Sequence, residues 1–271
     1  MHESPHNPRT MIQEITTVLE HSCFQGDYRL LKFAAPQIGP KARAGRFIHL
    51  RVPRLQNAVL RRPFSIFKAD AESVSILYKV VGKGTLALAD VKPGEAVDLL
   101  GPLGTGFPPA GKNKTEVALV AGGYGSAALY LQAAALPVKG TVFLGGRTAG
   151  DILCVDDFEK LGWKVEVTTD DGSCGRKGLV TGALDSWLSD RAGALDKVEI
   201  FACGPNGMLK AVGDRATAQG FTAWLSMDRN MACGTGACLT CVIKRKTKTG
   251  GWEWARCCKD GPVFNAEEIL W

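Results

Sequence analysis

Five cysteines near the end of the chain most constrain what it can fold into: Cys233, Cys238, Cys241, Cys257 and Cys258. The first three follow a C-x4-C-x2-C spacing. With a distant fourth cysteine, this is the plant-type arrangement that holds two irons and two sulfides. A loop around such a cluster needs small residues so that its N–H groups can point inward, and Gly234, Gly236 and Ala237 meet that need. The spacing therefore predicts a 2Fe-2S cluster, which passes single electrons.

The fourth ligand is expected from the residues that follow. The strings CVIKRK and WEWARC predict two strands joined by a turn through Lys248–Gly251. Pairing about the centre of that turn sets Cys241 opposite Cys258. Cys257 would then point to the other face of its strand. We therefore expect Cys258 to complete the ligand set.

A structural zinc site is the alternative, although such sites usually pair two C-x2-C units. In that case the basic run at 244–248, KRKTK, would dock nucleic acid or protein. A solvated turn is the simpler interpretation, because the basic residues are scattered and the net charge is only +6. Nine cysteines is an odd number, no apolar secretory segment opens the chain, and clustered thiols fit a reducing compartment. We therefore expect a cytoplasmic protein without disulfides.

The composition is typical of a globular protein. Of 271 residues, 45% are hydrophobic and 22% are charged, which excludes a disordered or fibrous class. The length allows two domains and a small module. The most apolar stretch, 117–137, contains three glycines and ends at Pro137. We expect a strand and a helix there, and no membrane segment.

The pattern of apolar residues changes along the chain. Short strand-like runs such as YRLLKF and SVSILYKVV recur up to residue 108 and predict a β-barrel. After 111–114, strands alternate with helical stretches, which predicts a mostly parallel sheet with flanking helices. We therefore predict a multi-domain β and α/β fold in four parts: a loose N-terminus at 1–10, a six-stranded-type β-barrel at 11–110, an α/β domain at 111–224 and a cysteine-rich module at 225–271.

Two stretches of the barrel carry candidate flavin-binding residues. In RRPFSI, Arg62 could pair with a pyrophosphate, Ser65 could reach a flavin ring nitrogen and Phe64 could cover the ring. In LYKVVGKGT, Gly84 and Thr85 would let the backbone approach phosphates. The alternative for the first stretch is an ordinary strand start with a stabilising proline, and for the second a turn with a helix cap.

Two strand-to-helix junctions of the α/β part are candidates for binding a nicotinamide cofactor. VAGGYGSAAL is not a full GxGxxG motif, but its glycines follow a strand and precede a helix; they are Gly122, Gly123 and Gly125. FACGPNGML ends a strand with Cys203, Gly204 and Pro205, and ligands bind at the carboxyl ends of strands in such sheets. The alternative for this second junction is a plain turn with a buried cysteine.

The order of these motifs along the chain, RPFS, GKGT, AGGYG, CGP and the cysteine run, resembles the ferredoxin-reductase superfamily. Within it, the chain is similar over roughly residues 11–271 to the electron-transfer subunits of class 1B dihydroorotate dehydrogenases. Four strings carry this resemblance: RRPFSI, TDDGSCGRKGLVT, MACGTGACLTCVIK and CKDGPVF.

The resemblance implies three sets of site residues. FAD would be bound in the barrel by Arg62, Pro63, Phe64, Ser65, Leu77, Tyr78, Lys79, Gly84 and Thr85. The ligands of the 2Fe-2S cluster would be Cys233, Cys238, Cys241 and Cys258, because the family's last cysteine directly precedes KDGPVF. NAD(H) would lie in the α/β domain near Gly122, Gly123, Gly125, Cys203, Gly204 and Pro205.

The chain also departs from the family pattern. Tyr124, Ala127 and Ala128 stand where relatives often show GxGxxP, and Asp228 stands where a glutamate is usual. The first departure bears on the affinity for the nicotinamide cofactor. The second is chemically small.

The resemblance implies a converter between two-electron and one-electron transfer in pyrimidine (UMP) biosynthesis. An FMN-containing catalytic subunit would oxidise dihydroorotate, and two copies of each subunit would assemble. Asp170 and Asp171, if near the adenosine ribose, would repel a 2′-phosphate and favour NAD over NADP. The small subunit of an NADH-dependent ferredoxin:NADP oxidoreductase shares nearly the same motifs and is the alternative. A full cysteine set favours the dihydroorotate system, because the other subunit can replace one ligand with aspartate.

Overall fold

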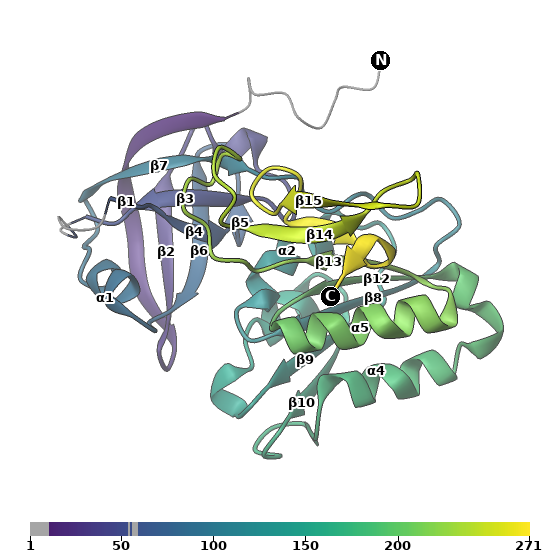
Figure 1. The fold of residues 1–271 in the computed structure, drawn as a ribbon. Coiled ribbons are helices and arrows are strands. Elements are labelled where there is room, and N and C mark those ends of the chain that lie inside the picture. Colours follow the sequence, from purple (N-terminus) through teal and green to yellow (C-terminus); the bar gives the residue numbers. More distant parts are fainter. Residues whose placement is uncertain (1–10, 54, 56–58) are drawn as a thin grey trace.

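The computed structural model describes residues 11–53, 55 and 59–271; the predicted loose N-terminus, 1–10, lies outside the described residues. The described part of the chain contains two seven-stranded sheets and one three-stranded sheet, together with the helices that connect and cover them. Figure 1 shows the first sheet on one side of the molecule, the second beside it with its helices, and the C-terminal strands over their junction. This arrangement confirms the predicted fold class.

The first sheet is the predicted barrel, with strand order β4-β3-β7-β1-β2-β6-β5. Its residues alternate between two environments, so that Ile48 and Leu50 fill the barrel interior while Phe47 packs outside it. β5 has only two residues. The elements are β1 (Ile12–Gln25), β2 (Tyr28–Ala34), β3 (Phe47–Arg51), β4 (Arg62–Ser65), β5 (Lys68–Ala69), β6 (Ser73–Lys79), α1 (Lys83–Ala89) and β7 (Ala96–Leu103).

The second sheet has the order β11-β10-β9-β8-β12-β13-β16 and is parallel except at β16. Apolar residues of α2 and α3 cover one face, and those of α4 and α5 cover the other. The elements are β8 (Glu116–Gly122), α2 (Gly125–Ala135), β9 (Thr141–Gly146), α3 (Val155–Lys160), β10 (Lys164–Thr169), β11 (Arg176–Lys177), α4 (Val180–Ser189), β12 (Val198–Cys203), α5 (Asn206–Gln219) and β13 (Thr222–Ser226).

The C-terminal segment contributes strands to two sheets, the α/β sheet and a separate three-stranded sheet. Its three-stranded sheet has the order β15-β14-β17, while β16 pairs with β13 and so becomes the last strand of the α/β sheet. The strands are β14 (Val242–Lys246), β15 (Trp252–Arg256), β16 (Val263–Asn265) and β17 (Ile269–Leu270). Short 3-10 helices lie at Gly39–Lys41, Ala149–Asp151, Ala192–Lys197 and Ala266–Glu268.

One apolar core joins the three parts. It includes Phe47 and Leu103 from the barrel, Ile200 from the parallel sheet, and Cys241 and Cys258 from the C-terminal module, all buried. Burial on this scale holds the module in one position against both domains. Among the described helices, none is long and apolar enough to cross a membrane.

The predicted hairpin is present, but its register differs by one residue from the prediction. Val242 pairs with Arg256, so the hairpin is centred one half-residue earlier than expected. Cys241 therefore lies opposite Cys257, whose N–H donates to the Cys241 carbonyl at 3.0 Å. The expectation that Cys241 lies opposite Cys258 was wrong.

The loop explains the shift. It runs from Thr247 to Gly251, and the Thr247 N–H closes it by donating to the Gly251 carbonyl at 2.9 Å. Gly250 takes φ +90°, a backbone conformation that favours glycine. Because β15 ends before Cys257 and Cys258, the alternation of strand side chains does not decide which of these two faces the first cysteine loop.

Candidate cofactor sites

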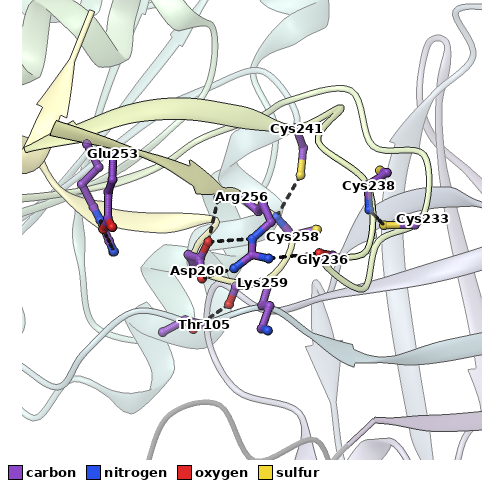
Figure 2. Close-up of polar contacts among 11 residues, drawn as sticks. Thr105, Cys233, Gly236, Cys238, Cys241, Glu253, Arg256, Cys258, Lys259 and Asp260 are labelled. Carbon is purple, nitrogen blue, oxygen red and sulfur yellow. Dashed lines mark hydrogen bonds and ion pairs between the residues drawn. The ribbon is translucent and has the colours of Figure 1, made fainter.

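The cysteine loop brings its first two thiols together. Figure 2 shows Cys233 and Cys238 side by side in the loop, with the backbone nitrogen of Cys238 directed at the Cys233 sulfur. The N–H groups of Cys238 and Thr235 donate to the Cys233 sulfur at 3.4 and 3.5 Å. Burial alone would raise the pKa of Cys233, but these donors outweigh it and lower that pKa to about 6. The loop therefore stabilises a thiolate, the form that binds iron.

The other two predicted ligands form a second pair. The N–H of Cys258 donates to the Cys241 sulfur at 3.4 Å, and both side chains are almost fully buried (Figure 2). Cys257 is also fully buried, and its backbone N–H donates to the Cys241 carbonyl, whereas the N–H of Cys258 donates to the Cys241 sulfur. A cluster with two irons and four thiolate ligands needs two such pairs, so this donor set fits a 2Fe-2S cluster.

Two glycines give the loop its shape. Gly234 takes φ +70° and Gly236 takes φ +86°, conformations that L side chains rarely adopt. A Cβ at Gly236 would lie 2.6 Å from Cδ of Lys259, and one at Gly234 would lie 2.5 Å from Nδ1 of His49. The third small residue of the prediction, Ala237, is exposed. Within residues 11–53, 55 and 59–271, no group of three or more His, Cys, Asp or Glu side chains is spaced to hold a single metal ion.

A cavity of about 210 Å³ lies between the barrel, the parallel sheet and the cysteine module. Seven of the nine residues predicted to bind FAD line it: Pro63, Phe64, Ser65, Leu77, Tyr78, Lys79 and Thr85. The other two lie together outside this lining, since a Cβ at Gly84 would lie 2.9 Å from Nε of Arg62. Glycine at this position thus leaves room for the arginine. The Thr85 hydroxyl accepts from the N–H groups of Val81 and Gly82 and so also caps α1.

A second cavity, of about 540 Å³, opens at the carboxyl ends of the parallel strands. Gly122, Gly123 and Pro205 of the predicted nicotinamide set line it. Gly125 does not, because it packs against β12, where a Cβ would lie 2.1 Å from the Cys203 carbonyl oxygen.

The remaining two nicotinamide candidates, Cys203 and Gly204, line the smaller cavity. Burial raises the pKa of Cys203 to about 12, so this thiol stays protonated at neutral pH. The predicted set is therefore divided between two neighbouring spaces.

Two residues belong to both cavities, Lys79 and Tyr124. The Tyr124 hydroxyl donates to Oδ2 of Asp228 at 2.9 Å, which joins two positions where we expected departures from the family pattern. The tyrosine ring is 47% exposed and stands where the two spaces meet. It is the side chain that a ligand spanning both cavities would have to pass.

Sequence reasoning missed Asp151, which ends the short 3-10 helix after β9. Its carboxylate accepts from Lys79 Nζ and the Tyr28 hydroxyl, both at 2.8 Å, and from Arg147 Nε at 3.2 Å. Burial acts to raise the pKa of Asp151, but the bonds from Lys79 and Tyr28 lower it to about 2. No local motif marks this residue, because its partners come from two domains.

The two aspartates expected near the ribose have different surroundings. Asp170 lines the larger cavity. Asp171 instead accepts hydrogen bonds from the N–H and hydroxyl of Ser173, at 2.9 and 2.7 Å, and so shapes the loop. Only Asp170 faces the space where a nicotinamide cofactor would bind.

Solved structures with the same fold carry related redox functions. The NADH-dependent reduced ferredoxin-NADP oxidoreductase, solved in a study of flavin-based electron bifurcation, matches with a TM-score of 0.82 and 31% identity, covering 95% of this chain and 90% of that one. The ferredoxin reductase of carbazole 1,9a-dioxygenase matches with a TM-score of 0.66, covering 78% of this chain and 67% of that one, at 20% identity, and so supports the fold alone.

Sequence relatives narrow the family. The model for the iron-sulfur cluster binding domain of dihydroorotate dehydrogenase B matches residues 228–270. The dihydroorotate dehydrogenase B (NAD(+)) electron transfer subunit of Desulforamulus reducens is 36% identical, over 89% of this chain and 92% of the relative. Its counterpart in Caldanaerobacter subterraneus subsp. tengcongensis is 40% identical, over 86% and 89%. Since this likeness spans most of both chains, the chain belongs to the family of dihydroorotate dehydrogenase B electron transfer subunits.

Proposed function

We propose that this chain passes electrons between NAD(H) and a partner subunit by way of bound FAD and a 2Fe-2S cluster. When bound, FAD exchanges a hydride with nicotinamide and single electrons with an iron-sulfur cluster. One observation carries the proposal: the cavity lined by the flavin candidates meets the nicotinamide cavity at Lys79 and Tyr124, and reaches the cysteine module at Met231 and Pro262. A single path thus connects the three candidate sites.

The barrel residues would hold and shield the flavin. Arg62, beside Gly84, offers a cation that suits a pyrophosphate. The rings of Phe64 and Tyr78 pack at 60° with centroids 5.7 Å apart and give the cavity an apolar wall. That wall excludes water from the reacting ring, and Ser65 supplies a hydroxyl at the same wall.

The residues of the α/β domain would orient the nicotinamide cofactor. Gly122 and Gly123 allow close approach of a ligand at the end of β8, and Gly123 takes φ +54°. Asp170 would disfavour a 2′-phosphate by charge repulsion. Cys233, Cys238, Cys241 and Cys258 would hold the cluster. We assign the units to residues 11–110, 111–224 and 225–271, and expect the chain to work in the cytoplasm.

The partner would be the FMN-containing catalytic subunit that oxidises dihydroorotate, assembled as two copies of each chain. The relatives are named electron transfer subunits, which implies a separate catalytic chain. Leu239, between two of the cluster cysteines, is 69% exposed and offers an apolar contact at that site. Light scattering of the mixed subunits tests the stoichiometry: a mass equal to two copies of each is expected, and one copy of each would contradict it.

The ferredoxin:NADP system supplies the second candidate function, because its solved structure matches at 31% identity over 95% of this chain. The partner discriminates between the two functions. With the dihydroorotate-oxidising subunit, this chain should reduce NAD on addition of dihydroorotate. Transfer only with a ferredoxin:NADP partner would favour the second candidate.

The first experiment is an anaerobic visible spectrum of the purified chain, with and without NADH, together with iron and zinc analysis. Flavin and iron-sulfur bands that bleach with NADH are expected, with about two irons per chain, as the cluster composition requires. A colourless protein with stoichiometric zinc would contradict the proposal and favour a zinc-binding interaction module.

A further inference from the structure

His49 lies on the outer face of the barrel, against the cysteine loop. Its strand neighbours Ile48 and Leu50 point into the barrel, whereas Phe47, two residues away, points toward the core shared with the cysteine module. The rings of Phe47 and His49 pack edge to face, 5.9 Å apart. A Cβ at Gly234 would lie 2.5 Å from both Nδ1 and Cε1 of the imidazole. Gly234, the residue next to Cys233, therefore lies directly against the imidazole ring, nearest its Nδ1 and Cε1 atoms.

The imidazole is fully buried and neither ring nitrogen has a hydrogen-bond partner in the described part of the chain. A buried polar group without a partner costs about 1–3 kcal/mol. Only four side-chain atoms among residues 11–53, 55 and 59–271 are in this state, and three of them belong to His49 and Arg229. Arg229 lies within the cysteine module, and its charge acts on Cys257. Most of the buried side-chain polar atoms without a hydrogen-bond partner in the described residues thus belong to residues in or beside the cysteine module.

Packing does not account for an imidazole here. Pro63 on β4 and Leu100 on β7 lie opposite His49, so its strand neighbours are apolar. Burial, followed by the charges of Arg61 and Arg62, lowers the pKa of His49 to about 4. The ring is therefore neutral at pH 7 and carries one N–H donor and one acceptor nitrogen.

We propose that His49 is a positioning residue for the iron-sulfur cluster, whose imidazole N–H donates a hydrogen bond to sulfur on the Cys233 side of the cluster. This inference rests on the proposed function, because the acceptor belongs to the bound cluster. Hydrogen bonds to cluster sulfur favour the reduced, more negative state and raise the reduction potential. His49 lies on β3, the strand that also carries Phe47 of the flavin cavity. Through His49, this strand would help to set the reduction potential of the cluster.

The test is a redox titration of the holoprotein, following the cluster by electron paramagnetic resonance and the flavin by absorbance. His49→Leu removes the hydrogen-bond donor and replaces the imidazole with an apolar side chain of similar size. We expect its reduction equilibrium to shift about tenfold toward the oxidised cluster, or about 59 mV for one electron. His49→Asn places an amide N–H near the position of Nδ1 and should stay within about threefold of the wild type. His49→Gln, with its amide farther out, should resemble His49→Leu.

Thr168→Val is the matched control. The Thr168 hydroxyl is the remaining buried side-chain atom without a partner in the described residues, and it lies on β10, away from the cysteine loop. Its removal should leave the cluster potential unchanged.

Four outcomes would count against the inference. An unchanged cluster potential in His49→Leu would overturn this inference but not the proposed function. A shift confined to the flavin would do the same. If His49→Leu does not fold, equal potentials for His49→Asn and His49→Gln would overturn it. A wild-type protein without the cluster signal would overturn the proposed function and this inference together.

Discussion

Lys79 of the barrel and Asp151 of the α/β domain form an ion pair across the boundary between the two domains, with 2.8 Å between Nζ and Oδ1. Both side chains are largely buried, at 21% and 11% exposure. The same carboxylate also binds Tyr28 and Arg147. Lys79 was expected to contact FAD, and it does line the flavin-side cavity. Its charge, however, is already neutralised by Asp151.

Asp151→Asn should therefore weaken the junction between the domains. The substitution leaves the largely buried Lys79 ammonium without its counter-charge, and we expect a loss of about 2 kcal/mol in the free energy of unfolding. Urea denaturation followed by circular dichroism measures this loss. Asp157→Asn is the control, because the Lys68–Asp157 pair also crosses the boundary but Lys68 is 40% exposed. It should cost less than about 1 kcal/mol. Equal losses would contradict a special role for Asp151.

The same carboxylate predicts an acid sensitivity. The pKa of Asp151 is lowered to about 2 from an ordinary value of 3.8, against the opposing effect of burial, by its bonds to Lys79 and Tyr28. Its stabilising contribution is complete above about pH 4 and is lost as the pH falls through about 2. The difference in unfolding free energy between wild type and Asp151→Asn should shrink by about 2 kcal/mol over that interval. A constant difference from pH 6 to pH 2 would show that the shift is absent.

The choice of the fourth ligand is decided by two serine variants. Cys258→Ser should lose most of its iron, because the Cys258 backbone and thiol adjoin the Cys241 sulfur. Cys257→Ser should keep its iron and lose stability, because it buries a hydroxyl at a fully buried position. Iron analysis and the visible spectrum separate the two cases. Retention of a normal cluster in Cys258→Ser, with loss in Cys257→Ser, would reverse the assignment.

Gly234 should tolerate no side chain. Gly234→Ala forces φ +70° on alanine and places its Cβ 2.5 Å from His49. We therefore expect the free energy of unfolding to fall by about 3 kcal/mol. Gly250→Ala is the control for backbone strain alone, since Gly250 has φ +90° and open space around it. It should cost about 1 kcal/mol. In a His49→Ala background, the cost of Gly234→Ala should fall toward the control value, as a double-mutant cycle would measure.

Asp170 should govern the choice of coenzyme. The Asp170 carboxylate lines the larger cavity. Asp170→Asn should therefore raise the rate of flavin reduction by NADPH, relative to the rate with NADH, by about tenfold. Asp171→Asn should leave that ratio unchanged, because its carboxylate binds Ser173. Stopped-flow reduction with each coenzyme gives the ratio. If the wild type were reduced tenfold better by NADPH than by NADH, the preference for NAD would be wrong.

The fold was predictable because each part carries a strong local pattern. Alternating residues such as Ile48 and Leu50 mark barrel strands, and glycines such as Gly122 mark strand-to-helix junctions of a parallel sheet. The hairpin register was not predictable, because the composition of the turn did not fix its length. A loop of one residue more or less changes the partner of Cys241.

The site was predictable where its residues are close in sequence. The run Pro63 to Ser65 lines one cavity as a unit. Asp151 and His49 could not be predicted, because each gains its significance from a residue in another unit. Tyr124 was noted as a departure from the family pattern, but its hydrogen bond to Asp228 could not be predicted. The contact between His49 and Gly234 joins positions 185 apart in the chain. Gly234 was expected in the cluster loop, but nothing in its segment points to His49.

The pairing of β13 with β16 has a consequence for how the protein is made. On the ribosome, the parallel sheet emerges with β13 as an open edge, and an open edge is a template for pairing with other chains. The strand that covers it, Val263–Asn265, lies after the last of the nine cysteines. The parallel sheet can therefore be completed only after all the cysteines have been synthesised. A chain truncated before β16 would keep every cysteine but expose the edge of β13, and should be prone to aggregate.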